Sequence, residues 1–442
     1  MAPGTGARQR ELRRGEDRII PESVGWLARL FPRAFYGWIV AAGTGAVSFV
    51  TVGIGFYGQT LLFDGLRSAY GWPIASLAGA SSLFFVVSAL ASPIVGLRVD
   101  RDGPRRYIVV GACLLAASLV AVAWLDHPWQ LYLVYPAMAL GFTMSSAIPS
   151  SALIARWFVA SRARAMAFSQ TGVSLGGMFL VPLATWLMST AGLRSAMLVL
   201  AGLLLAIAIP VTAGVLRSRP EDYGLEPDGG PQQGPEGKRL PLAGQRRRWE
   251  TREVLRTPSF WLLCVAFSGI LFAQVGVLVH ELALLRERLD LATAAVAFAL
   301  TPLGSAVARI AVGLVADRLD RQRLAVGLFA VQALALYAFG WAPDTASLFA
   351  VSFLFGCTIG NIFMLQALLV GEFFGMMSFG SVYGLLQLAT QVASGLGPFG
   401  LALLVDYFGD YRGALGVLAG VAALSALVLS RVSPPRPAED KA

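Results

Sequence analysis

The sequence predicts an all-α polytopic membrane protein with twelve transmembrane helices, arranged as two parallel repeats of six. Three observations predict this class: an apolar composition, twelve long apolar runs, and a motif that occurs once in each half. Hydrophobic residues make up 56% of the 442 residues and charged residues 14%, with a mean hydropathy of +0.66. Soluble proteins contain roughly 45–50% apolar and about 25% charged residues. The composition therefore excludes an ordinary soluble enzyme, a disordered chain, a fibrous protein and a coiled coil.

Each apolar run approaches the length of about 20 residues that a helix needs to cross a bilayer. The predicted helices cover residues 37–62, 75–98, 107–125, 131–155, 164–189, 194–216, 258–283, 292–316, 324–342, 346–371, 380–405 and 413–431. Between the sixth and seventh helices lies a polar stretch rich in Pro, Gly and charge, which is typical of a linker. We therefore expect an N-terminal arm, a first bundle, a linker, a second bundle and a tail, at residues 1–36, 37–216, 217–257, 258–431 and 432–442.

The basic residues are distributed unequally between the two sides of the predicted helices. The net charge is +9, and with the N-terminus placed inside, 29 of the 35 Lys and Arg residues fall on the inner side and five on the outer side. Positively charged loops stay in the cytoplasm, so both termini are expected there, in a multi-pass protein of a bacterial inner membrane. No cleavable signal peptide is recognisable, and the first helix is expected to remain as an anchor. The lipid bilayer thus explains the basic charge without a nucleic-acid partner.

Two copies of a glycine–aspartate–arginine motif lie 217 residues apart, after the second and the eighth predicted helix. They read GLRVDRDGPRR and GLVADRLDRQR. The glycine lets a neighbouring helix approach closely, and the aspartate can accept hydrogen bonds at the N-terminus of a helix from the other bundle. Such a tie would hold one conformation and break in another, whereas the alternative is a pair of positively charged turns. The predicted gating residues are Gly96, Asp100, Arg101, Gly103, Arg105, Arg106, Gly313, Asp317 and Arg318.

The first copy of this motif resembles the loop signature of the major facilitator superfamily, and the second resembles its weaker copy. The segments RWFVASRARAMAFSQTGVSLGG (156–177) and SAVARIAVGLVADR (305–318) also resemble the monocarboxylate transporters and their bacterial relatives, including oxalate/formate antiporters. The resemblance covers residues 36–431. It implies the major facilitator fold and secondary-active transport by alternating access. It also implies that Arg309, four residues before Gly313, binds a substrate carboxylate.

Arg309 is also unusual on physical grounds. It lies eight residues before Asp317, which at ~1.5 Å per residue places it about 12 Å inside the helix end, near the middle of the bilayer. A charge at that depth costs at least ~2.5–3.5 kcal/mol, and no carboxylate on the same helix offsets it. Guanidinium matches a carboxylate with two parallel hydrogen bonds. Arg309 is therefore the predicted ligand of an anion, and the alternative is a structural arginine bonded to carbonyl groups of a neighbouring helix.

Other polar residues inside the predicted helices are candidate substrate ligands, because an unpaired polar group in hydrocarbon is costly and normally faces a cavity or another helix. Each could equally tie two helices together. These candidates are Tyr57, Gln59, Ser146, Gln170, Asn361, Gln387 and Gln391. Near the outer end of the seventh helix, His280 is the candidate for proton coupling because histidine titrates near neutral pH; the alternative is an interfacial histidine. Glu281 beside it is expected to be solvated at the membrane boundary.

Together these features predict a secondary-active transporter of a small organic anion, a monocarboxylate, driven by proton symport or by exchange for a counter-anion. We expect it to function as a monomer. The alternative function is proton-driven efflux of neutral or amphipathic compounds. An enzyme is not expected, because no HExxH motif and no other catalytic cluster indicates an intramembrane hydrolase. No cofactor and no metal are expected either.

Overall fold

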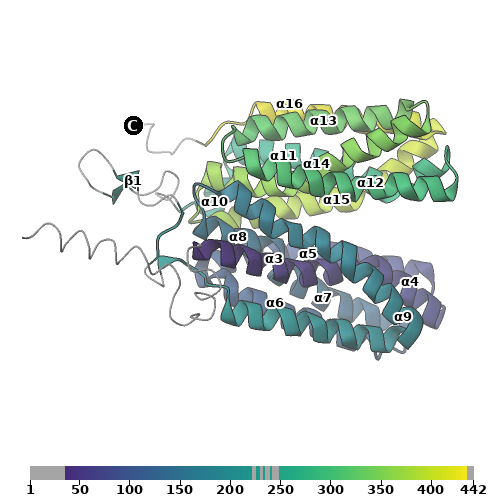
Figure 1. Ribbon diagram of the computed structural model, residues 1–442, viewed down its shortest axis with the longest axis horizontal. Coiled ribbons are helices and arrows are strands. Elements are labelled where there is room, and N and C mark those ends of the chain that lie inside the picture. Colours follow the sequence, from purple (N-terminus) through teal and green to yellow (C-terminus); the bar gives the residue numbers. More distant parts are fainter. Residues whose placement is uncertain (1–34, 222–224, 229–231, 234–238, 241–247, 436–442) are drawn as a thin grey trace, which may run out of the picture.

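The computed structural model consists of long helices that lie side by side in two halves, coloured purple to teal and green to yellow in Figure 1. It describes residues 35–221, 225–228, 232–233, 239–240 and 248–435. The arm before residue 35, Lys238 and the end of the tail lie outside these ranges. The first half contains α3 (Tyr36–Gly55), α4 (Gly58–Tyr70), α5 (Ile74–Asp102), α6 (Pro104–Val122), the 3-10 helix η2 (Pro128–Gln130), α7 (Leu131–Ser145), α8 (Ala147–Trp157) and α9 (Arg162–Gly214).

The second half repeats this pattern after the linker. The linker contributes two antiparallel strands of two residues each, β1 (Gln232–Gln233) and β2 (Arg239–Leu240), and the short helix α10 (Thr251–Leu255). The second half contains α11 (Pro258–Arg286), α12 (Leu291–Val315), α13 (Arg321–Trp341), α14 (Thr345–Phe374), α15 (Phe379–Phe408) and α16 (Tyr411–Ser430). We use "linker end" for the end of the bundle where the linker lies, at the left of Figure 1, and "far end" for the opposite one.

Eleven helical stretches among the described residues are long and apolar enough to span a membrane. One of them, α9, has 53 residues and contains two helices that meet at Gly192. Gly192 has φ 77° and ψ 167°, a backbone conformation that glycine adopts without steric cost. The described chain therefore crosses twelve times, and the predicted all-helical membrane fold is confirmed.

Two of the predicted helices are broken, which hydropathy does not reveal. The predicted run 37–62 is divided into α3 and α4 by Phe56 and Tyr57, and α4 continues to Tyr70. The run 131–155 is divided into α7 and α8 at Ser146, which has φ −107° and ψ −123°. Broken helices inside a membrane are tolerated where the freed backbone groups face other protein segments or water. Both breaks lie in the first half. Two site candidates, Tyr57 and Ser146, lie at these breaks.

Among the described residues, the buried apolar core joins the two halves at the linker end. One buried cluster runs through the second half and continues into the linker end of the first half. Its members include Val99 and Met166 from the first half with Leu365 and Val382 from the second. A separate buried cluster fills the far end of the first half, with residues from Val50 to Ala208. Because close side-chain packing drives helix association inside a membrane, this shared cluster holds the halves together at the linker end.

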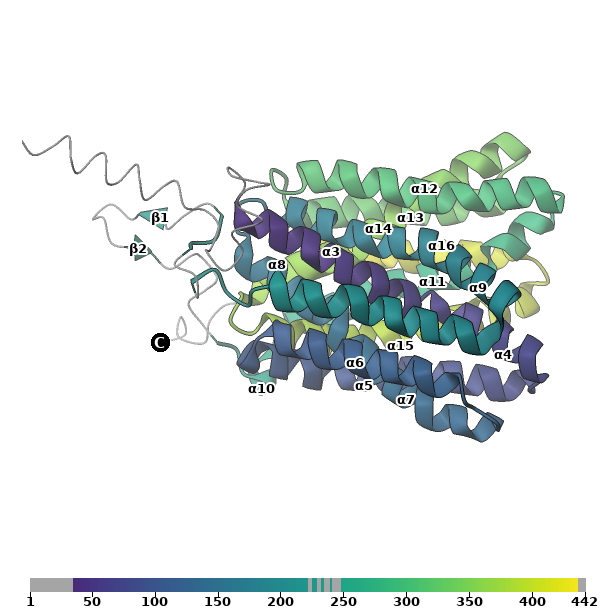
Figure 2. The same cartoon turned by 60° about the horizontal axis from the view of Figure 1, so that its bottom comes forward.

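Two helix pairs supply most of the contact between the halves. Helix α5 packs along α15, and α9 packs along α12; Figure 2 labels all four helices. Smaller contacts join α14 to α9 and α15 to α8. The contact between α5 and α15 is very close: a Cβ atom added to Gly96 would lie 1.9 Å from the carbonyl oxygen of Gly380. Glycine at this position therefore permits the backbones of α5 and α15 to touch, as small residues do in membrane helix packing.

Candidate functional site

Asp100 connects the two halves at the linker end. It lies in the last turn of α5, and its carboxylate accepts hydrogen bonds from the backbone N–H groups of Gly380 and Ser381, at 2.8 and 2.7 Å. The Ser381 hydroxyl donates a third bond, at 2.5 Å. These donors belong to the first turn of α15, where backbone N–H groups have no partner within the helix. Asp100 thus caps a helix of the opposite half.

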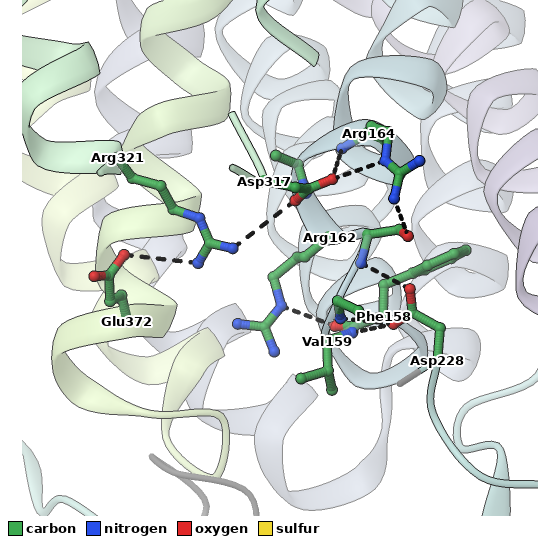
Figure 3. A network of polar contacts seen from close by, with 11 residues as sticks. Phe158, Val159, Arg162, Arg164, Asp228, Asp317, Arg321 and Glu372 are labelled. Carbon is green, nitrogen blue, oxygen red and sulfur yellow. Dashed lines mark hydrogen bonds and ion pairs between the residues drawn. The ribbon is translucent and has the colours of Figure 1, made fainter. Parts of the chain in front are cut away.

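Asp317 does the same at the equivalent position of the second repeat, as Figure 3 shows. Its carboxylate accepts hydrogen bonds from the backbone N–H groups of Ala163 and Arg164, at 2.8 and 3.2 Å, and from Arg164 Nε at 3.1 Å. These donors open α9 of the first half. Both aspartates therefore make the inter-half hydrogen bonds that the repeated motif predicted, while a gating role for them stays a prediction.

The other residues of the repeated motif have different surroundings. Gly313 packs against α9, because a Cβ atom there would lie 2.4 Å from that of Ala167. Gly103 has a φ of 86° and forms the turn between α5 and α6. Arg105 donates to the carbonyl oxygens of Thr212 and Ala213 within the first half, at 2.9 and 2.5 Å. The remaining three side chains are exposed at the linker end: Arg101, Arg106 and Arg318.

Further charged residues surround Asp317 in Figure 3. Arg321 bridges Asp317 and Glu372, at 3.9 and 3.6 Å. Arg162 is buried and its Nε donates to the Phe158 carbonyl oxygen, at 2.9 Å. These side chains connect α9, α13 and α14 around one carboxylate. Arg321 lies within the second copy of the motif, so sequence reasoning could have included it, whereas Glu372 is far from the motif along the chain.

Asp228 of the linker binds the loop that leads into α9. Its carboxylate accepts hydrogen bonds from three successive backbone N–H groups, those of Val159, Ala160 and Ser161 (Figure 3). Its own N–H donates to the Trp157 carbonyl oxygen, at 3.2 Å. Sequence analysis missed this residue, because a single aspartate in a polar linker carries no signal of what it binds.

Arg309 links the halves in the last third of α12, six residues before its end. Its side chain is only 7% exposed. One terminal nitrogen donates to the carbonyl oxygen of Gln170 at 2.5 Å and to Ser174 Oγ at 2.8 Å, both on α9. Its Nε atom is buried without a hydrogen-bond partner, and the guanidinium has no acidic partner among the described side chains. The cation is thus balanced only by a backbone carbonyl and a hydroxyl.

Three other candidates lie around Arg309. Tyr57, at the break between α3 and α4, is 39% exposed and close enough to Arg309 for electrostatic interaction. Gln170 contributes its backbone carbonyl to the contact. Asn361 follows Gly360, against which the guanidinium packs, and its Oδ1 is a buried acceptor without a partner. The residues gathered here come from both halves, so the cluster lies between them.

The remaining substrate candidates make other contacts. Gln59 points into the first half, where its Nε2 donates to the Gly55 carbonyl oxygen at 3.0 Å and contacts Met138 Sδ at 3.4 Å. Ser146 is buried at the break between α7 and α8. Gln387 accepts a hydrogen bond from the neighbouring Thr390 hydroxyl at 3.2 Å, and Gln391 is half-buried one turn later. Within the described part of the chain, none of these four residues makes a hydrogen bond with Arg309.

His280 and Glu281 are adjacent in sequence but differ in surroundings. His280 Nδ1 lies 3.2 Å from the Tyr411 hydroxyl, at the far end of the second half. Glu281 was expected to be solvated, and this expectation is wrong: its side chain has 0% exposure. Successive residues in a helix point about 100° apart, so Glu281 turns inward and contacts Thr301 of α12. Hydropathy cannot reveal this difference in direction.

Comparisons with known proteins identify the family and the fold of the chain. A family model described as Major Facilitator Superfamily matches residues 45–398 and again 275–442. The chain is 25% identical over 300 residues to the oxalate:formate antiporter of Oxalobacter formigenes, which is 67% of each chain. It is 27% identical over 412 residues to monocarboxylate transporter 11 of Homo sapiens, 89% of this chain and 82% of that one. The solved structure of the transporter FucP in the outward conformation matches with a TM-score of 0.71 and 12% identity, covering 90% of this chain and 100% of that one; this likeness concerns the fold alone.

Proposed function

The chain belongs to the major facilitator superfamily of membrane transporters, and we propose that it carries a small organic anion, a monocarboxylate, between its two halves. One observation carries the proposal. The buried guanidinium of Arg309 lies between the halves, with one unpartnered nitrogen and no acidic partner among the described side chains. A buried charge normally has a counter-charge. A substrate carboxylate supplies one and matches the planar donors of guanidinium.

The distribution of contacts supports a transport cycle of alternating access. The halves share an apolar core and two aspartate caps at the linker end, and Arg309 adds a polar contact eight residues before Asp317. We propose that the substrate enters from the far end and replaces Gln170 and Ser174 as the partner of Arg309. Release of these two bonds loosens α12 from α9, so that the linker end can open. With the orientation expected from the positive loops, the far end faces the outside of a bacterial inner membrane.

The relatives support an anion as cargo, since one is named for oxalate and formate and the other for monocarboxylates. Energy would come from proton symport or from exchange for a second anion. The lone positive charge at the site favours a substrate with one carboxylate, because among the described residues no second buried cation is found beside Arg309. We propose that a single polypeptide performs the transport cycle, since both halves of the site belong to one chain.

The test is uptake of labelled lactate, pyruvate, acetate and benzoate into proteoliposomes, with and without an inward proton gradient. Arg309→Ala is expected to lower uptake about 100-fold or more, because removing one partner of a buried charge pair costs ~3–5 kcal/mol. Arg309→Lys retains the charge but loses the paired donors, so it tests the geometry. Arg67→Ala, which removes an exposed arginine at the far end, is the control.

Two outcomes would overturn the assignment. Undiminished anion uptake by Arg309→Ala would make Arg309 a structural residue that ties α12 to α9. Absence of uptake of every acid, together with altered resistance to neutral or amphipathic drugs on deletion, would favour efflux of such compounds instead. Trans-stimulation by an internal anion would identify exchange, and gradient-stimulated uptake would identify proton symport.

A further inference from the structure

Glu281 is a buried carboxyl group that the proposed anion site does not use. It lies on the membrane-spanning helix α11 and has 0% exposure. The hydroxyl of Thr301, on α12, is hydrogen-bonded to its Oε1. Ser352 of α14 lies beside the carboxyl group. Glu281 on α11 thus lies next to side chains of α12 and α14 in the second half. Among the described residues it forms no ion pair.

The hydrogen-bond pattern around Thr301 indicates which atom holds the proton. Thr301 Oγ1 lies within hydrogen-bond distance of two oxygens, Glu281 Oε1 and the backbone carbonyl oxygen of Ser352, the latter at 3.1 Å. A hydroxyl has one hydrogen to donate, and both a carbonyl oxygen and an ionised carboxylate only accept. An ionised Glu281 would therefore compete with Ser352 for a single hydrogen.

A protonated Glu281 removes this competition. Its O–H donates to Thr301 Oγ1, and Thr301 in turn donates to the Ser352 carbonyl oxygen. The second carboxyl oxygen, Oε2, and the Ser352 hydroxyl both lack a hydrogen-bond partner, and this hydroxyl can donate to the carbonyl oxygen of a carboxylic acid. An ionised carboxylate would stay buried inside the protein without a cation, which is strongly unfavourable.

The charged and titratable groups on the surrounding helices do not offset a negative charge at this point. On α12 the one ionisable residue is Arg309, eight residues beyond Thr301, or about 12 Å along the helix. On α14 they are Cys357 and Glu372, and on α11 the neighbour is His280, which contacts Tyr411.

Helix α11 also packs against α15 and α16. Their ionisable residues are Tyr383, Asp406 and Tyr407 on α15, and Tyr411 and Arg412 on α16. None of the groups named on these helices makes a hydrogen bond or ion pair with Glu281 within the described ranges.

We propose that Glu281 is the proton-binding site of this transporter, and that its proton crosses the membrane with the substrate anion. Movement of the proton together with the substrate anion rests on the proposed function, whereas proton binding by Glu281 does not. Loss of the proton breaks the chain of hydrogen bonds from Glu281 through Thr301 to Ser352, which joins α11, α12 and α14. The last two helices pack tightly, since a Cβ atom on Gly356 would lie 2.1 Å from the Thr301 carbonyl oxygen. Proton binding therefore determines whether hydrogen bonds join α12, which carries Arg309, to both α11 and α14.

The first experiment is infrared difference spectroscopy of the reconstituted protein between acidic and alkaline pH, which needs no substrate. Wild type is expected to show the carbonyl stretch of a protonated carboxyl group that disappears at alkaline pH. Glu281→Gln is expected to lack this band, because the amide keeps both donor and acceptor but cannot titrate. Glu287→Gln, an exposed position on the same helix end, is the matched control and should keep it. Thr301→Val should move the band to higher wavenumber by removing its hydrogen-bond partner.

The second experiment compares gradient-driven accumulation with counterflow of the same anion. Glu281→Gln is expected to lose accumulation driven by a proton gradient and to retain counterflow, which needs no net proton movement. A band unchanged in Glu281→Gln and in Thr301→Val would overturn proton binding, and intact gradient-driven accumulation in Glu281→Gln would overturn the coupling. If wild type transports no carboxylate, the proposed substrate is wrong, while the infrared result still decides whether Glu281 holds a proton.

Discussion

Asp100 and Asp317 make the same contact in the two repeats. Each lies at the C-terminal end of a helix of one half and caps the first turn of a helix in the other half. The donors are backbone N–H groups that have no partner inside their own helix. A carboxylate side chain that accepts from such N–H groups acts as a helix N-cap, supplied here by the opposite half. The linker end is therefore closed by two equivalent polar contacts, on opposite sides of the interface, in addition to its apolar core.

Removal of both carboxylates is expected to open the linker end. Hydrogen bonds to a charged group contribute ~1.5–3 kcal/mol, so Asp100→Asn with Asp317→Asn should shift the conformational equilibrium about 10- to 100-fold or more. Spin labels at two exposed residues, Arg106 and Arg323, report the distance between the halves, which should increase. The exposed Asp102→Asn is the control, and an unchanged distance distribution in the double variant would disprove the gating role.

Gly96→Ala should have a similar effect for a steric reason. The added Cβ atom would lie 1.9 Å from the Gly380 carbonyl oxygen, and this overlap is relieved only when α5 moves away from α15. We expect the distance between labels to increase and anion counterflow to fall at least tenfold. Gly327→Ala, where nothing lies within 4 Å of the added atom, should behave as wild type. Equal counterflow in both variants would show that the close approach is not needed.

Ser174→Ala is expected to increase substrate affinity. Ser174 occupies one donor of Arg309, and a substrate carboxylate must displace it. Loss of a hydrogen bond worth ~0.5–1.5 kcal/mol should therefore tighten binding by about 2- to 10-fold, measured by calorimetry on the purified protein. Thr171→Ala is the control, because that hydroxyl bonds only to the Ala167 carbonyl oxygen of its own helix. Weaker binding by Ser174→Ala would indicate that the hydroxyl contacts the substrate itself.

Hydropathy and the repeated motif were sufficient to predict the membrane fold and the two aspartate caps. Helix length and apolar content are properties of the sequence alone, and the repeat places Asp100 and Asp317 at equivalent helix ends. The break at Ser146 could not be predicted, because apolar content does not report backbone angles. The burial of Glu281 was predicted wrongly, because the direction of one side chain depends on which helices pack around it.

Asp228 gives the last prediction, which concerns the linker. Its carboxylate accepts hydrogen bonds from the backbone N–H groups of Val159, Ala160 and Ser161, while Asp317 binds the next turn, at Ala163 and Arg164. Asp317 belongs to the second half and separates when the linker end opens. Asp228 binds only the first half in this loop, so it is expected to hold the start of α9 throughout the cycle.

Hydrogen exchange distinguishes these two contacts. Asp228→Ala should speed exchange at Val159, Ala160 and Ser161 by about 10- to 100-fold, given ~1.5–3 kcal/mol for bonds to a carboxylate. Asp317→Asn should speed exchange at Ala163 and Arg164 without changing the preceding three residues. Glu221→Ala, at an exposed linker position, should change neither group. If Asp228→Ala left all five amides protected, the loop would be held by α9 itself, and the linker would be only a connection between the halves.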